Sequence, residues 1–143
     1  MFLRSSLRAE EADSIMLRMS DSAPCKHVVI IGVGLIGGSV AAAVKRRWPE
    51  CRVTGIGRRA ERLQAARQAG LLDDWAQSVG DATFDQGAVV VVCLPVDLIP
   101  ASVIEIAEVT SDDVLITDGG SVKKSIQDGV DLSPLAASRF VGA

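Results

Sequence analysis

Three glycines, Gly32, Gly34 and Gly37, have the spacing GxGxxG and follow directly on an apolar run, in the segment VVIIGVGLIGGS. A glycine loop of this kind makes a tight turn and lets the backbone approach a phosphate group at the N-terminus of a helix. A bare GxGxxG motif is weak evidence, so the flanking residues decide whether it carries that chemistry.

The flanking segments have the composition that a phosphate-binding loop requires. His27–Ile31 is almost entirely β-branched, as a buried parallel strand should be, and Leu35–Arg47 is alanine-rich and suits a helix. This arrangement is typical of dinucleotide binding, and we expect Gly34 and Gly37 to keep Cβ atoms away from a pyrophosphate. A membrane helix over Val28–Val44 is the alternative, but that run is short of the about 20 residues needed and is interrupted by glycines.

Beyond residue 26 the chain alternates between apolar strand-like runs and mixed helix-like runs, which is typical of an α/β fold with parallel strands. The predicted strands are His27–Ile31, Arg52–Ile56, Ala88–Cys93 and Val114–Asp118, with Phe140 and Val141 beginning another. The predicted helices are Leu35–Arg47, Ala60–Ala69 before Gly70, Leu98–Glu108 opened by Asp97, and a helix with Ser121 at its N-cap that runs to Asp128. Residues 71–87 are ambiguous: Trp75 and Val79 fit a short strand or a short helix packed under the loop.

These elements predict a Rossmann-type, doubly wound, mainly parallel sheet. The carboxyl ends of its strands should lie along one edge, where the loops at Gly32, Gly57, Leu94 and Gly119 converge. That edge is the predicted ligand site.

Composition excludes several classes of function. With 143 residues and a net charge of −3, the chain fits one domain and has no basic footprint, so no nucleic-acid partner is expected. Three widely spaced cysteines and a single histidine indicate neither a disulfide framework nor a metal site. Because the first 25 residues lack the apolar segment of a secretory signal, we expect a cytoplasmic protein without a membrane partner.

No linker divides the chain after its first segment. We expect residues 1–25 to be a disordered leader, because their basic and acidic side chains are mixed without a regular period. A transit peptide is the alternative, although such peptides are poor in acidic residues. Residues 26–143 are then an NAD(P)-binding Rossmann domain.

The end of the second predicted strand indicates which dinucleotide is preferred. A site for NAD usually has a carboxylate there, about 20 residues after the glycine loop, and this count leads from Gly37 to Gly57. Arg58 and Arg59 follow, and a guanidinium group can bond phosphate oxygens in pairs. We therefore predict NADP rather than NAD. The alternative is that both arginines are solvated residues at the start of a helix, where the helix dipole disfavours a cation.

The sequence resembles the prephenate and arogenate dehydrogenase family through three motifs. These are GVGLIGGS at Gly32 to Ser39, CLPV at Cys93 to Val96 and TDGGSVK at Thr117 to Lys123, within a resemblance that covers residues 26–143. The resemblance implies an oxidoreductase of tyrosine biosynthesis that transfers a hydride from prephenate or arogenate to NADP while the ring carboxylate leaves as carbon dioxide. Gly119 departs from the family, which more often has an apolar residue there, and we expect a small effect on the loop.

The resemblance also implies roles for individual residues. Those expected at the pyrophosphate are Gly32, Gly34, Leu35, Ile36 and Gly37. Leu94 and Pro95 would line the path from adenosine to nicotinamide, and Ser121 would lie near the nicotinamide with a tentative catalytic role, or act only as an N-cap. Asp118 is either a substrate partner or, more in keeping with its place before two glycines, a turn residue. Cys93 and His27 are expected to be structural.

The family's catalytic histidine lies in a GAHP motif, and this sequence stops at Gly142 and Ala143, directly before the corresponding position. The family's helical C-terminal domain, which supplies dimer contacts, is also absent. We therefore expect cofactor binding without turnover, and a homodimer only for a full-length enzyme. Two alternatives stay open: a non-catalytic NADPH-binding or regulatory module, and a Rossmann dehydrogenase of the 3-hydroxyacid or imine-reducing kind. Dehydrogenases of the 3-hydroxyacid or imine-reducing kind usually have GxMG-like residues after the glycine loop. Leu35 and Ile36 of this sequence fit that pattern poorly.

Overall fold

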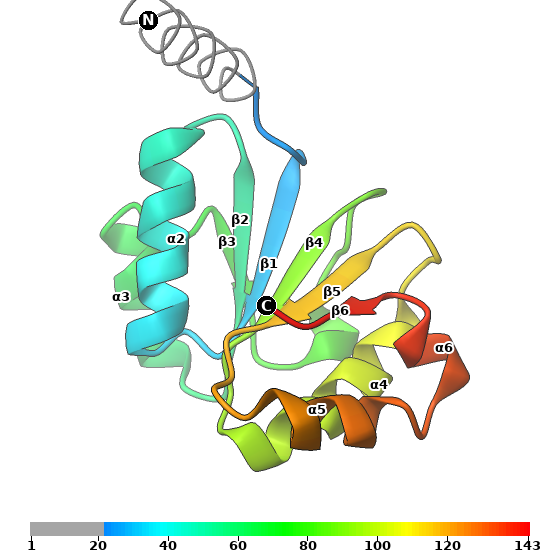
Figure 1. Ribbon diagram of the computed structural model, residues 1–143. Coiled ribbons are helices and arrows are strands. Elements are labelled where there is room, and N and C mark those ends of the chain that lie inside the picture. Colours follow the sequence, from blue (N-terminus) through cyan, green and yellow to red (C-terminus); the bar gives the residue numbers. More distant parts are fainter. Residues whose placement is uncertain (1–21) are drawn as a thin grey trace, which may run out of the picture.

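The computed structural model describes residues 22–143, and in this part of the chain six strands form one parallel sheet in the order β3-β2-β1-β4-β5-β6 (Figure 1). The strands are β1 (His27–Ile31), β2 (Arg52–Ile56), β3 (Asp74–Ala76), β4 (Val89–Val92), β5 (Leu115–Asp118) and β6 (Phe140–Val141). The predicted Rossmann-type, doubly wound sheet is confirmed. The expected leader, residues 1–25, lies outside the described residues except for its last four.

Helices cover both faces of the sheet (Figure 1). One face carries α2 (Leu35–Arg47) and α3 (Ala60–Gln68), and the other carries α4 (Ile99–Val109), α5 (Lys123–Val130) and the short α6 (Pro134–Ala137). Successive strand residues point to opposite faces, so Val28 and Ile30 pack in one apolar cluster while Val29 and Ile31 pack in the other. Burial on both faces explains why β1 is apolar without alternation.

The bounds of β1, α2 and β2 are those expected from the sequence, and Gly70 follows α3 with a positive φ of 79°. Two predicted helix starts are wrong. Asp97 lies inside a 3₁₀ turn, η2 (Val96–Leu98), because the chain already turns at Pro95, and α4 begins only at Ile99. Ser121 is not an N-cap, because α5 begins at Lys123 after Val122 and has no side-chain cap.

The ambiguous segment contains two short elements, one with Trp75 and one with Val79, and one further short helix was not expected. β3 and a second 3₁₀ turn, η1 (Val79–Asp81), lie within residues 71–87. The helix α6 begins after Ser133, whose hydroxyl oxygen accepts a hydrogen bond from the Ala136 amide at 3.3 Å. These three elements are too short for their sequences to show a helical or strand period. Their structure therefore depends on contacts with distant residues.

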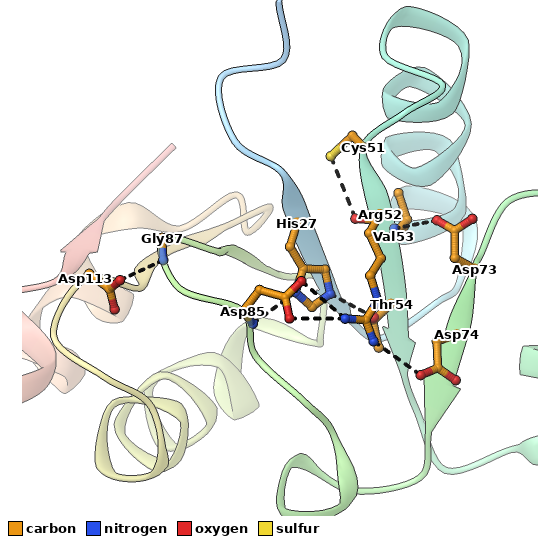
Figure 2. A network of polar contacts seen from close by, with 10 residues as sticks. All are labelled: His27, Cys51, Arg52, Val53, Thr54, Asp73, Asp74, Asp85, Gly87 and Asp113. Carbon is orange, nitrogen blue, oxygen red and sulfur yellow. Dashed lines mark hydrogen bonds and ion pairs between the residues drawn. The ribbon is translucent and has the colours of Figure 1, made fainter.

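A polar network occupies the amino edge of the sheet (Figure 2). The buried His27 ring accepts a hydrogen bond at Nδ1 from the Asp85 amide, 3.2 Å away, so its Nε2 donates to Thr54 Oγ1 at 2.8 Å. Arg52 bridges two carboxylates, with Asp85 at 3.1 Å and Asp74 at 3.5 Å. The network joins β1, β2, β3 and the loop before β4, so His27 has a structural role at the edge opposite the glycine loop.

The stability of the fold should fall as the pH drops from 7 to 5. Burial, with Arg52 contributing, lowers the pKa of His27 in the folded state despite the opposing charge of Asp85. The folded state therefore favours neutral His27, and this contribution is complete above the unfolded-state pKa of about 6.5 and is lost as the pH falls below it. Chemical denaturation at pH 7, 6 and 5 measures the change.

The variant His27→Asn should lose about 1–3 kcal/mol of unfolding free energy at pH 7, because buried partners are left unpaired. Its unfolding free energy should also change less between pH 7 and 5 than that of the wild type. An equal pH dependence in both proteins would contradict the role assigned to His27.

Candidate cofactor-binding site

The carboxyl edge of the sheet brings together the loops that follow β1, β2, β4 and β5. Their first residues are hydrogen bonded into the neighbouring strand ends: the Gly32 amide donates to Ile56 O at 2.8 Å, Cys93 to Ile31 O at 2.7 Å, and Gly119 to Val92 O at 3.0 Å. The chain runs outward in one direction through β2 and β3, and in the other through β4 and β5. The switch point lies between β1 and β4, where ligands of such sheets bind.

Two glycines allow α2 to begin directly against this edge. Gly32 has a φ of +88°, and a Cβ there would lie 2.5 Å from Cys93 O. A Cβ on Gly37 would lie 2.1 Å from Gly32 O, so the absence of a side chain at Gly37 permits the contact between helix and loop. Gly37 therefore has a packing role within the protein that the sequence analysis did not assign to it, and its expected place beside a pyrophosphate stays a prediction.

Gly34 differs from these two residues, because a Cβ built on it meets nothing within 4 Å. It is the N-cap of α2 and provides no side-chain hydrogen bond, and the first turn of the helix has no acidic residue. The first-turn N–H groups therefore lack an intrahelical partner and lie at the positive end of the helix dipole. Leu35 is 93% exposed and Ile36 is 59% exposed, which leaves this turn open to an anion.

Arg58 and Arg59 lie where the sequence placed them, in the loop that follows β2. Both side chains are exposed, and Arg59 occupies the N-cap position of α3 without a side-chain cap. Within residues 22–143 neither guanidinium group takes part in an ion pair. The two cations thus stand unpaired beside the positive end of a helix dipole, an arrangement that favours a bound anion.

The loop after β4 contributes a mostly apolar wall. Leu94 is half-buried against the core, and its Cδ2 lies 3.0 Å from the position of a Cβ on Gly32, while Pro95 is exposed. Burial raises the pKa of the Cys93 thiol, and the nearby Asp118 adds to the effect. Cys93 is therefore held as an unreactive thiol at neutral pH.

The loop after β5 is organised by Asp118. Its side chain is fully buried, and Oδ2 accepts hydrogen bonds from the Gly120 amide and from Lys123 Nζ, each at 2.8 Å. Oδ1 accepts a bond from the Ala143 amide at 3.3 Å. Burial alone would raise the pKa of Asp118, but the bond from Lys123 and the two amide bonds hold it below its usual value. The bond from the Gly120 amide, two residues further on, is that of a turn residue, the role favoured by the place of Asp118 before two glycines.

Ser121 lies on this loop and is exposed, and Lys123 is the residue whose importance the sequence reasoning missed. Both belong to the motif TDGGSVK. The five-residue separation of Asp118 and Lys123 is no helix or strand neighbour spacing, so only the folded loop reveals the ion pair. A Cβ on Gly119 would lie 3.4 Å from Ile36 Cγ2 and 3.6 Å from Cys93 Sγ, so the loop has room for a small side chain there.

Within residues 22–143, no helix is long and apolar enough to cross a lipid bilayer. The same residues contain no group of three or more His, Cys, Asp or Glu side chains that could hold a metal ion.

A parallel sheet with a glycine loop at its switch point defines a nucleotide-binding domain of the Rossmann type. The family model for the nucleotide-binding domain of prephenate dehydrogenase matches residues 40–143, and the chain therefore belongs to the prephenate dehydrogenase family.

Relatives and solved structures agree with this assignment. Prephenate dehydrogenase of Bacillus subtilis (strain 168) is 34% identical over 116 residues, which cover 80% of this chain and 31% of that protein. Cyclohexadienyl dehydrogenase of Zymomonas mobilis is 35% identical over 101 residues, or 71% of this chain and 34% of that protein. The crystal structure of Aquifex aeolicus prephenate dehydrogenase with hydroxyphenyl propionate and NAD+ has a TM-score of 0.74 and 27% identity, and covers 85% of this chain and 42% of its own. The chain thus spans about a third of the length of the curated relatives.

Alanine at two glycines of the loop should separate ligand binding from stability. Gly34→Ala adds a methyl group in open space, so the loss of unfolding free energy should be limited to the poorer N-capping of alanine, below about 1 kcal/mol. Binding of the dinucleotide should be at least about tenfold weaker, about 1.4 kcal/mol. Gly37→Ala should lose about 1–3 kcal/mol of unfolding free energy through overpacking. NADPH fluorescence titration and urea denaturation measure the two effects, and unchanged NADPH binding in Gly34→Ala would refute the assigned phosphate position.

Proposed function

We propose that residues 26–143 are the cofactor-binding domain of an NADP-preferring dehydrogenase that carries out the oxidative decarboxylation of prephenate or arogenate in tyrosine biosynthesis, in the cytoplasm. Membership of the prephenate dehydrogenase family supports the reaction class. The observation that carries the cofactor preference is the pair Arg58 and Arg59 at the end of β2, unpaired among the described residues.

The preference for NADP rests on the residues of this chain. Gly57 stands where an NAD site usually has a carboxylate for the ribose 2′-hydroxyl, so that polar contact is missing. The guanidinium groups that follow suit a 2′-phosphate, because they donate paired hydrogen bonds to its oxygens. The Aquifex aeolicus structure contains NAD+, so the proposal of NADP is based on Gly57, Arg58 and Arg59 of this chain and not on that structure.

The remaining residues of the edge have complementary tasks in this proposal. The first-turn amides of α2, from Leu35 onward, bind the pyrophosphate, and Gly32 and Gly34 let it approach the backbone. Leu94 and Pro95 line the path toward the nicotinamide, and Ser121 lies at the nicotinamide end. When bound, NADP+ supplies the hydride acceptor.

The single histidine of the sequence, His27, lies at the amino edge and is buried in the polar network. These 143 residues therefore place no imidazole at the carboxyl edge to accept the proton of a substrate hydroxyl. We propose that the chain binds the cofactor, and that the catalytic base, most of the pocket for the small-molecule substrate and the contacts of a homodimer come from sequence outside it. No nucleic-acid or membrane partner is part of this proposal.

Replacing both arginines should abolish the cofactor preference. In Arg58→Ser/Arg59→Ser the Kd for NADPH should rise by about 10- to 100-fold, as expected for the loss of charge-assisted hydrogen bonds of about 1.5–3 kcal/mol. The Kd for NADH should stay within about twofold. Fluorescence titrations at fixed ionic strength measure both constants. Arg62→Ser, which removes an exposed arginine within α3, is the control and should bind both cofactors as the wild type does. An unchanged NADPH affinity in the double variant would eliminate the phosphate clamp.

The purified 143-residue chain should not reduce NADP+ when supplied with prephenate or arogenate, although it binds NADPH. The physical reason is the absence of an imidazole from the carboxyl edge, since general base catalysis requires a group within hydrogen-bond reach of the substrate proton. Absorbance at the NADPH maximum measures turnover. Reduction of NADP+ above the rate without enzyme would show that the chain holds its own base, and binding without turnover also agrees with a non-catalytic NADPH-binding module.

A further inference from the structure

Asp118 is a buried carboxylate at the end of a strand that reaches the cofactor edge. Its side chain is 0% exposed, whereas that of its ion-pair partner Lys123 is 43% exposed. Burying a carboxylate costs free energy unless charge and hydrogen bonds compensate. Three donors compensate here, and each comes from a different segment of the chain.

The first donor is the Gly120 amide, in the loop between β5 and α5. Because Gly119 and Gly120 are both glycines, this loop has little conformational preference of its own. A Cβ on Gly120 would lie 2.6 Å from Ile126 Cδ1 and 2.8 Å from Ile99 Cδ1, so the loop runs close against α5 and α4. The carboxylate thus restrains a loop that the sequence leaves flexible and that carries Ser121.

The second donor, Lys123, is the first residue of α5. A cation in the first turn of a helix is disfavoured by the helix dipole, and α5 has no side-chain cap. The charge of Asp118 offsets this cost and fixes where the helix starts. The third donor is the Ala143 amide, 25 residues away in sequence, so the same carboxylate also holds the chain that follows β6.

The three segments held by Asp118 lie on the half of the sheet where we expect the nicotinamide end of the cofactor. A Rossmann sheet binds a dinucleotide with one nucleotide at each half. If the adenosine ribose lies at Arg58 and Arg59 beyond β2, the nicotinamide lies on the half formed by β4, β5 and β6. The loop reaches the first turn of α2 at that end, where a Cβ on Gly119 would lie 3.4 Å from Ile36 Cγ2.

We propose that Asp118 is a positioning residue for the nicotinamide half of the site, because its carboxylate fixes the loop of Ser121, the start of α5 and the chain after β6 as one surface. This inference rests on the proposed function. It predicts that changes at Asp118 affect the nicotinamide end of the ligand and spare the adenosine end.

The test compares two ligands in the 143-residue chain: NADP+, and 2′-phospho-ADP-ribose, which lacks only the nicotinamide. In Asp118→Asn the carboxamide keeps the size of the side chain but removes its charge and one acceptor oxygen. Isothermal titration calorimetry should show at least about threefold weaker binding of NADP+ and an affinity for 2′-phospho-ADP-ribose within about twofold of the wild type. Asp112→Asn, an exposed carboxylate at the amino end of β5, is the control and should change neither affinity.

A second variant keeps the test decisive if Asp118→Asn does not fold. Lys123→Gln removes the charge partner from a partly exposed position, and it should weaken NADP+ in the same direction while again sparing 2′-phospho-ADP-ribose. Equal losses for both ligands, or no loss for either, in the variants that fold would overturn the positioning role. Failure of the wild-type chain to bind either ligand would instead overturn the proposed function, and the inference with it.

Discussion

The architecture of the carboxyl edge depends on one close contact, the approach of α2 to the loop that follows β1. A Cβ on Gly37 would lie 2.1 Å from Gly32 O, and a Cβ on Gly32 would lie 2.5 Å from Cys93 O, so backbone meets backbone at both places. Because no side chain separates them, the first turn of α2 lies at the switch point of the sheet. The open N–H groups of that turn thereby become a site for an anion.

Arg58 and Arg59 at the carboxyl edge differ from the charged residues of the amino edge. At the amino edge, Arg52 is paired with Asp85 and Asp74, and His27 has partners on both ring nitrogens. At the carboxyl edge, Arg58 and Arg59 have no ion pairs with any described residue. Satisfied polar groups stabilise a fold, whereas unpaired cations near open helix amides lower the free energy of a bound anion. This contrast supports the carboxyl edge as the proposed ligand site.

The sequence was sufficient for elements whose signal is local. The bounds of β1, α2 and β2 follow from a β-branched run, a glycine loop and an alanine-rich segment, and the positive φ of Gly70 follows from its place after a helix. The sequence was insufficient for elements whose structure depends on contacts with distant residues. β3 is a strand because it pairs with β2, and its residues Asp74, Trp75 and Ala76 show no strand pattern.

The same distinction explains the errors in the candidate site. Serine after two glycines is a reasonable N-cap, but Asp118 organises this loop through Lys123 and through the Ala143 amide 25 residues away. The packing role of Gly37 was missed because the group that a Cβ there would meet, Gly32 O, comes close to it only in the folded loop. Local sequence patterns thus predicted the carboxyl edge of the sheet and its glycine loop. The contacts between distant residues that shape this edge could be identified only in the folded chain.

The two halves of the edge rely on electrostatic interactions of different kinds. Arg58 and Arg59 are exposed, so their attraction for a phosphate is screened by salt over a distance of about 8–10 Å at physiological ionic strength. The Asp118 carboxylate is fully buried, and its bonds to Lys123 and Gly120 are screened much less. Ionic strength should therefore weaken the discrimination between phosphorylated and unphosphorylated cofactor while leaving the loop of Ser121 in place. Recognition of the adenosine end thus depends on salt-screened charges at the surface, whereas the geometry of the nicotinamide end depends on a buried carboxylate that salt affects much less.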